Sequence, residues 1–133
     1  MRLQIKNRLF FICKLTLKAK KDISAKISKA EDMASYKGRE AASRGGLVGA
    51  LEEYARTGVA VGEKYKSDHI KKAEDILNTL KREEKKIKNS TLSQADREAL
   101  LLRINNLRNS IMPAYQKAKQ RKSQLGVNNN GIL

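Results

Sequence analysis

Apolar and small residues recur with helical spacing from the start of the chain, in a stripe containing Ile5, Leu9, Ile12, Thr16, Ala19 and Ile23. After a shift of one position the stripe continues through Ile27, Ala30, Ala34 and Ala41. A period near 3.6 residues is typical of an amphipathic helix. The pattern therefore predicts one long helix that ends near Ser43.

A β-strand is the alternative interpretation for residues 3–17. Every second residue is apolar at Leu9, Phe11, Cys13, Leu15 and Leu17, as in a half-buried strand. Phe10 and Ile12 interrupt this alternation, and the chain offers no second convincing strand as a partner. We therefore favour helix for this segment.

Glycine interrupts the helical pattern after Arg44. Five of the eight glycines lie between Gly45 and Gly62, and each glycine costs about 1 kcal/mol inside a helix. The segment predicts a corner and a short helix, with a face formed by Leu47, Leu51, Tyr54 and Ala55. Residues 58–64 lack the spacing and the Ser/Thr of a phosphate-binding loop, so close helix packing or a hinge is the better interpretation.

Two further helices are predicted in the second half of the chain. The first runs from about Gly62 to Lys88, and one of its faces contains Ile70, Ala73, Leu77, Leu80, Glu84 and Ile87. After a loop, Ser93 and Asp96 form a pattern close to a capping box. The last helix follows, with a stripe of Leu100, Ile104, Leu107, Ile111, Ala114 and Ala118. Pro113 should kink this helix or end it early.

Together these elements predict an all-α fold. Two amphipathic helices joined by a short loop pack as a hairpin, and the long N-terminal helix covers the remaining face. We expect a three-helix antiparallel bundle, or an elongated helical hairpin plus a long N-terminal helix, with a short Gly-rich corner helix. Residues 1–122 form the single domain, and residues 123–133 form a disordered tail.

The net charge of +15 is gathered at the two ends of the chain. Residues 1–21 contain seven Lys/Arg and residues 99–133 contain six, and neither segment contains an acid. The 77 residues between them sum to only +2. Two acid-free basic segments indicate two surfaces, or one joint surface, that face an anionic partner.

Candidate catalytic chemistry is lacking in the sequence. His69 is the only histidine, and it has no cysteine at metal-ligand spacing. We expect a non-enzymatic protein without metal or cofactor. The basic and apolar N-terminus imitates a signal peptide, but Lys14 interrupts the apolar run and no cleavage site follows. We therefore expect neither a cleaved signal nor a membrane span, and a cytoplasmic or virion-associated location.

The leading functional hypothesis is non-specific binding of nucleic acid through its phosphates. The residues expected to form the anion-binding surface are Arg2, Lys6, Arg8, Lys18, Lys20, Lys21, Lys117, Lys119, Arg121 and Lys122. Another anionic partner would satisfy the same charges. One alternative is a structural or assembly protein, such as a virion or secretion-system component, that packs against copies of itself or a partner. A second alternative is peripheral membrane association through the basic and apolar N-terminus.

One segment is similar to a known family. In residues 89–111 a Thr-Leu-Ser turn leads into Asp-Arg and a helix with Ile and Leu at heptad spacing. This pattern resembles part of the N-terminal helical hairpin of bacterial flagellins. The rest of the chain departs from that family, because its Lys-rich ends are unlike the filament-core segments of flagellin. The resemblance implies a helical hairpin and makes assembly a function to consider.

Overall fold

The computed structural model describes the backbone of residues 2–58 and 68–131, and the side chains of residues 15–39, 42–58 and 68–125. Its helices are α1 (Arg2–Ser35), the short 3-10 helix η1 (Glu40–Arg44), α2 (Gly46–Thr57), α3 (His69–Lys88) and α4 (Gln94–Gly131). The described residues include no strand. The predicted all-α class is therefore confirmed, and residues 3–17 are helical.

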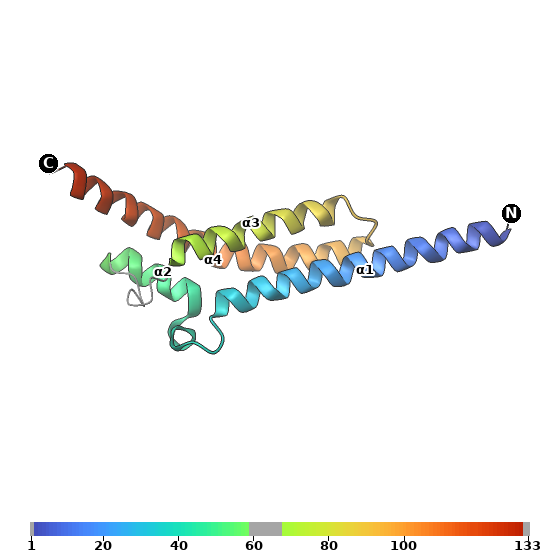
Figure 1. The fold of residues 1–133 in the computed structure, drawn as a ribbon, viewed down its shortest axis with the longest axis horizontal. Helices are drawn as coiled ribbons and strands as arrows, with labels where there is room; N and C mark the ends of the chain where they lie inside the picture. Colours follow the sequence, from blue (N-terminus) through green and yellow to red (C-terminus); the bar gives the residue numbers. More distant parts are fainter. Residues whose placement is uncertain (1, 59–67, 132–133) are drawn as a thin grey trace.

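Three long helices lie lengthwise against one another, with α3 running opposite to α1 and α4 (Figure 1). The short helix α2 packs mainly on α4 and also contacts α1 and α3. The molecule is elongated, and its two termini lie at opposite ends (Figure 1). The N-terminal part of α1 extends beyond the turn that joins α3 to α4 (Figure 1).

The core lies between the four helices and is almost entirely aliphatic. Its largest fully buried side chains are Ile27, Leu47, Leu51, Ile76, Leu80, Ile87, Ile104 and Ile111. Complete burial of such a side chain contributes about 1.5–3 kcal/mol to the free energy of folding. Because these residues come from α1, α2, α3 and α4, the apolar stripes meet one another in a common core.

The buried face of α3 contains four of the six predicted residues, Ile70, Ala73, Leu80 and Ile87, and differs from the prediction at the other two. Ile76 is 1% exposed, whereas Leu77 is only partly buried, and Glu83 rather than Glu84 occupies a buried position. The reason is that α3 packs against α1 as well as α4. On α4 the predicted stripe is buried at every position except Leu107, which is partly buried at its edge.

The predicted end of the first helix near Ser43 is wrong, because α1 ends at Ser35. Tyr36 has a left-handed φ of 55°, and Gly38 also has a positive φ of 81°. This reversal turns the Tyr36 ring inward, where its hydroxyl lies 2.7 Å from Nδ1 of His69. The helical period of the sequence cannot reveal this turn, because the hydrogen bond that stabilises it involves His69 of α3.

The glycines after Arg44 allow α2 to begin directly against the end of α1. Gly46 has a φ of 63°, and a Cβ built on it would lie 2.6 Å from the carbonyl oxygen of Ala34. Any side chain at this position would collide with backbone. The predicted short helix is confirmed, and the glycines serve close packing there.

The predicted start of the second helix near Gly62 is wrong. Asp68 is extended and caps α3, because its carboxylate accepts a hydrogen bond of 2.9 Å from the backbone N–H of Lys71. The predicted helical turns in residues 62–67 lie outside the described residues. At α4 the predicted cap is present, since Ser93 Oγ accepts a hydrogen bond of 3.2 Å from the Asp96 N–H.

The last helix passes through Pro113 and continues to Gly131. Figure 1 shows that its C-terminal part takes a different direction from its first part, which agrees with the predicted kink. Ile111 and Ala114 are buried on either side of the exposed proline and hold both parts in place. The predicted disorder of residues 123–133 is not confirmed, because the backbone stays helical to Gly131, while residues 132–133 lie outside the described residues. Leu125 packs beside Gly58 at the end of α2, which supports this extension.

Candidate anion-binding surface

The two groups of basic residues, which we expected to form either two surfaces or one joint surface, lie toward opposite ends of the molecule (Figure 1). The N-terminal group belongs to α1, and the C-terminal group belongs to the last third of α4. A joint surface formed by both groups is therefore wrong. Antiparallel packing of the last two helices predicts Lys64 and Lys66 beside the C-terminal group, but both residues lie outside the described part of the chain.

The N-terminal group is partly engaged in the fold. Lys18 and Lys21 are exposed on α1, whereas Lys20 Nζ forms an ion pair of 3.0 Å with Asp96 at the start of α4. The hydrogen bond from Lys20, followed by one from the Ser93 side chain, lowers the pKa of the Asp96 carboxyl. The side chains of Arg2, Lys6 and Arg8 lie outside the described part of the chain.

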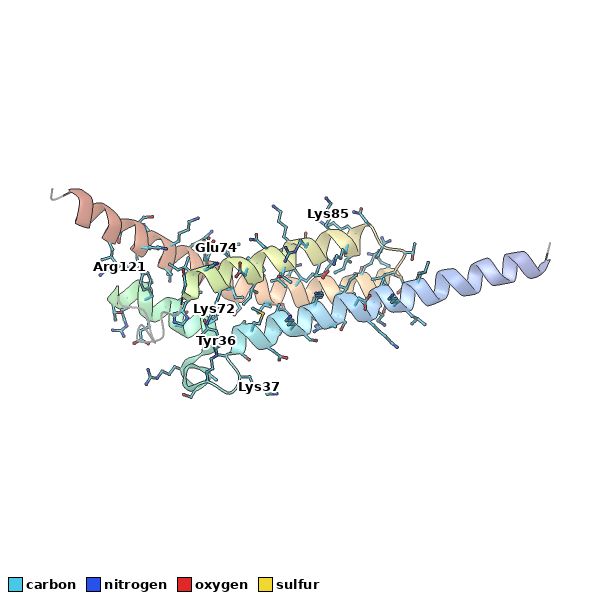
Figure 2. The ribbon with its side chains drawn as sticks, in the orientation of Figure 1. Tyr36, Lys37, Lys72, Glu74, Lys85 and Arg121 are labelled. Carbon is cyan, nitrogen blue, oxygen red and sulfur yellow. The ribbon has the colours of Figure 1, made fainter. Side chains whose placement is uncertain are left out.

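The C-terminal group divides into exposed and packed members. Lys117 and Lys122 are exposed, and Lys119 Nζ lies 5.7 Å from the centroid of the Tyr115 ring. Arg121 instead packs against the end of α2, where a Cβ on Gly58 would lie 3.1 Å from its Nε (Figure 2). The buried Nε of Arg121 has no hydrogen-bond partner among the described residues. Arg121 therefore acts in helix packing.

Three acids of α1 and α3, namely Glu31, Glu74 and Glu84, bind side chains of α4. Glu31 on α1 accepts a hydrogen bond of 2.5 Å from Arg103, whose guanidinium also reaches Ser24 and Ser28. Glu74 on α3 accepts a hydrogen bond of 2.9 Å from the Tyr115 hydroxyl. Burial, followed by the hydrogen bond to the Glu74 carboxylate, raises the pKa of Tyr115.

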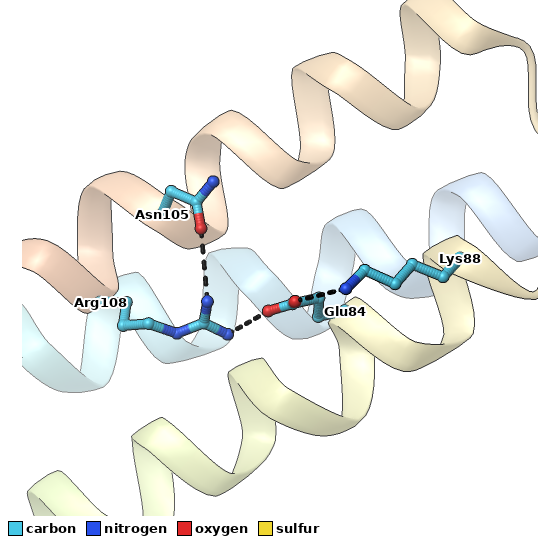
Figure 3. Close-up of polar contacts among 4 residues, drawn as sticks. All are labelled: Glu84, Lys88, Asn105 and Arg108. Carbon is cyan, nitrogen blue, oxygen red and sulfur yellow. Dashed lines mark hydrogen bonds and ion pairs between the residues drawn. The ribbon is translucent and has the colours of Figure 1, made fainter.

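Glu84 lies between α3 and α4 and has two basic partners. It forms an ion pair with Arg108 of α4 and another, of 3.0 Å, with Lys88 one turn further along α3 (Figure 3). Asn105 accepts a hydrogen bond of 3.3 Å from Arg108 and orients its guanidinium (Figure 3). The hydrogen bond from Arg108, followed by that from Lys88, holds the pKa of the Glu84 carboxyl below its ordinary value.

The opposite side of α3 faces α1 across a groove lined with cations. Three adjoining hollows of about 880, 340 and 300 Å³ follow one another along it, and neighbouring hollows share lining residues. We name this feature the α1–α3 groove. Its eight basic lining residues are Lys26, Lys29, Lys37, Arg39, Lys72, Arg82, Lys85 and Lys86.

Three acids line the α1–α3 groove, and one of them is hardly accessible. Asp22 and Asp32 are exposed on α1, whereas Glu83 is 2% exposed. Lys86 Nζ lies 3.2 Å from both carboxylate oxygens of Glu83. Eight cations against three acids give the groove a net charge of +5 in the middle of the segment that sums to only +2. An anionic chain would find a positive potential there.

At its α2 end the groove narrows to the hollow of about 300 Å³, which we name the Tyr36 pocket. Its lining residues are Lys29, Asp32, Met33, Tyr36, Lys37, Arg39 and Lys72. The Tyr36 ring is 5% exposed, and burial raises the pKa of its hydroxyl to about 12. The hydroxyl therefore stays protonated at neutral pH and can donate its hydrogen bond to His69. His69 is thus a buried interhelical residue.

The described residues offer neither a metal centre nor a membrane span. No group of three or more His, Cys, Asp or Glu side chains among them could hold a metal ion. None of the helices is, within its described residues, both long enough and apolar enough to cross a bilayer.

Comparison with protein-family models, with curated proteins and with solved structures found no match. The helical hairpin that the resemblance to flagellins implied is present as α3 and α4. Membership of that family receives no support from these comparisons.

The α1–α3 groove was missed by sequence reasoning that summed charge along the chain. Its signal lies in helical spacing: Lys26, Lys29 and Met33 share one face of α1, and Thr79, Arg82 and Lys86 share one face of α3. A helix-by-helix plot of charge would have revealed both basic faces. The sequence alone could not have shown that the two faces meet.

Proposed function

We propose that this protein binds nucleic acid without sequence preference, through contacts between phosphates and the cations of the α1–α3 groove. The supporting observation is the row of eight basic residues that line one continuous groove, six of them on α1 and α3 and two, Lys37 and Arg39, on the turn after α1. In this proposal α1, α3 and α4 form a three-helix antiparallel bundle that serves as a rigid support. The exposed Lys residues near the two termini extend the contact surface at either end.

The dimensions of the groove suit a polyanion. From Lys72 to Lys86 the lining residues of α3 span about 21 Å at a helical rise of 1.5 Å per residue. Phosphates along one DNA strand follow one another about every 3.4 Å of helix axis, so these residues span roughly six of them. A row of cations matches such a repeating charge better than it matches one small anion.

The lack of sequence preference follows from the kind of side chain in the groove. Lysine and arginine contact phosphates without reading base edges, and these contacts position a protein on its duplex. Among the lining residues, Tyr36 is the aromatic one, and its buried ring is not available for stacking on bases. We therefore expect duplexes of different sequence to bind with similar affinity.

The test compares two triple variants of equal charge. The groove variant has Lys26→Gln, Lys29→Gln and Arg82→Gln, and the control has Arg56→Gln, Lys71→Gln and Lys81→Gln, which are exposed and do not line the groove. Binding of two fluorescent duplexes of unrelated sequence is measured by anisotropy over a range of salt. The slope of log affinity against log salt should become shallower by up to about 2.7 in the groove variant.

The control triple variant should keep most of the affinity and the salt slope. Equal losses in both variants would show that only net charge matters, and an unchanged groove variant would refute the assignment to the groove. A wild-type protein that binds neither duplex at low salt would refute nucleic-acid binding itself. Lys86 is left unchanged because it is the partner of the buried Glu83.

One observation favours assembly as a second candidate function. The N-terminal part of α1 extends beyond the other helices (Figure 1). Leu15 and Leu17 are 51% and 58% exposed on either side of Thr16, whose hydroxyl lies 2.7 Å from that of Thr91 in the turn between α3 and α4. Exposed large apolar residues on a projecting helix are typical of a contact with another chain. Size-exclusion chromatography with light scattering should then show oligomers that Leu15→Ser together with Leu17→Ser converts to monomers. A monomeric wild type would exclude self-assembly.

A further inference from the structure

The Tyr36 pocket differs from the rest of the α1–α3 groove in how its cations are held. The backbone at Tyr36 is left-handed, with a φ of 55°, and bulky residues adopt this conformation only at a cost. A hydrogen bond of 2.9 Å from the Arg39 N–H to the Tyr36 carbonyl closes the turn. Such a strained turn persists where its surroundings determine it, here through the buried ring and its bond to His69.

The buried ring brings two cations from different elements together. Lys72 Nζ of α3 lies 5.1 Å from the centroid of the Tyr36 ring, and the Arg39 guanidinium carbon lies 5.5 Å from it. Figure 2 shows Tyr36 and Lys72 next to each other where α1 ends and α3 begins, with Lys37 on the turn below. Cation–π contacts of this kind position the two charges before any ligand arrives.

Lys72 and Arg39 lie close together with little negative charge near them. Burial, followed by the nearby Arg39 guanidinium, lowers the pKa of the Lys72 ammonium, and Asp68 only partly opposes this effect. Among the described residues, four cations and one carboxylate, that of Asp32, line the pocket. An anion in the pocket would relieve the repulsion between Lys72 and Arg39, so bound negative charge is favoured there.

The size and position of the pocket indicate which anion fits. Its volume of about 300 Å³ is at the lower end of the range for small-molecule sites. The Tyr36 pocket is the last of the three hollows along the groove, and α2 contacts both α1 and α3. A strand that follows the groove would therefore end there, and a terminal phosphate monoester has close to two negative charges at neutral pH.

We propose that the Tyr36 pocket binds a phosphomonoester dianion, held by Arg39 and Lys72 with Lys29 and Lys37 at the rim. This goes beyond the proposed function, because the pocket needs only the phosphomonoester group and not a strand. The group could belong to a free nucleotide or to the 5′ end of a nucleic-acid strand.

The first arm of the test uses adenosine 5′-monophosphate, with adenosine as its uncharged counterpart, in isothermal titration calorimetry. The pocket variant has Arg39→Gln and Lys72→Gln, and the control has Arg56→Gln and Lys71→Gln, two exposed residues outside the pocket. Loss of each charge-assisted contact should weaken binding about tenfold. Circular dichroism verifies that both variants are folded.

The second arm compares one duplex with and without a 5′-phosphate. If the strand end is the ligand, the wild type should prefer the phosphorylated duplex, and the pocket variant should lose this preference while it binds the unphosphorylated duplex as before. A free-nucleotide ligand should give binding in the first arm alone. Either result, with the control variant unaffected, supports the pocket.

The proposal is overturned if the wild type binds the monophosphate no more tightly than adenosine and the phosphorylated duplex no more tightly than the unphosphorylated duplex. It is also overturned if the pocket and control variants weaken binding equally, because general electrostatic attraction then suffices. Failure of the proposed function is distinguishable, since it is the loss of salt-dependent binding to the unphosphorylated duplex.

Discussion

The two sides of α3 use charged residues in opposite ways. Toward α4, the carboxylates of Glu74 and Glu84 are bound by Tyr115 and Arg108. Toward α1, the accessible charges of α3 are cations, and its one acid, Glu83, is buried. Side chains of α4 thus bind acids of α1 and α3. The basic faces of α1 and α3 line the groove instead. Charge pairing in one interface determines the electrostatics of the other.

This comparison explains why a segment with a net charge of only +2 can present a strongly basic surface. Summing charge along a sequence averages over all faces of a helix, whereas a partner encounters one face at a time. The acids of residues 22–98 include several engaged by other parts of the fold, as Glu31 is by Arg103. The cations that remain lie together because they share faces of α1 and α3.

The largest expected effect concerns the core to which α4 contributes its buried face. Ile104 is completely buried, whereas Leu102 on the same helix is 60% exposed. Ile104→Ala should lower the free energy of unfolding by about 2–5 kcal/mol, because a cavity adds to the lost burial. Leu102→Ala should change it by less than about 0.5 kcal/mol. Urea unfolding followed by circular dichroism measures both, and equal effects would contradict the assigned face.

A smaller effect should separate the two sides in terms of charge. Arg103 bridges α4 to Glu31, Ser24 and Ser28 of α1, so Arg103→Gln should cost about 1–2 kcal/mol after allowance for partial exposure. Arg82 in the groove bonds only locally, to Thr79 at 3.2 Å, and Arg82→Gln should leave stability within about 0.5 kcal/mol. Chemical denaturation of both variants provides the measurement.

The same two arginine variants should show the reverse order in duplex binding. Arg82→Gln should weaken it because it removes a groove cation, whereas Arg103→Gln should change it less. If Arg103→Gln were as stable as the wild type and Arg82→Gln were less stable, our assignment of Arg103 to helix packing and of Arg82 to the groove would be wrong.

Local sequence rules were sufficient for much of the fold. The stripe on α4, the Ser93 cap and the short helix α2 follow from helical spacing, capping chemistry and glycine content. The end of α1 could not be predicted in this way. Helical spacing continues through Ala41, but the bond between Tyr36 and His69 connects residues 33 positions apart and favours a turn.

The candidate site was less predictable than the fold. The two basic ends were visible in the sequence, but the structure places them apart and engages Lys20 and Arg121 within the fold. The groove depends on which faces of α1 and α3 meet, and Glu83 is buried on α3 in place of the predicted Glu84. Tertiary packing decides which of the two is buried, and one sequence does not reveal it.

The smallest expected effect is a pH dependence of the free energy of unfolding, caused by Glu84 on the side of α3 that faces α4. Because Arg108 and Lys88 lower the pKa of Glu84 in the folded protein, its ionised form is stabilised there relative to the unfolded chain. This contribution is complete above the ordinary glutamate pKa of 4.5 and is lost as the pH falls through the lower folded value. The stability difference between wild type and Glu84→Gln, which we expect to be under about 1 kcal/mol, should be constant from neutral pH down to the ordinary glutamate pKa of 4.5 and shrink in more acidic solution. An Arg108→Gln background should reduce both the difference and its pH dependence, since the hydrogen bond from Arg108 is the main cause of the lowered pKa. Urea unfolding at a series of pH values tests this, and a difference that grows on acidification would contradict the assigned ion pair.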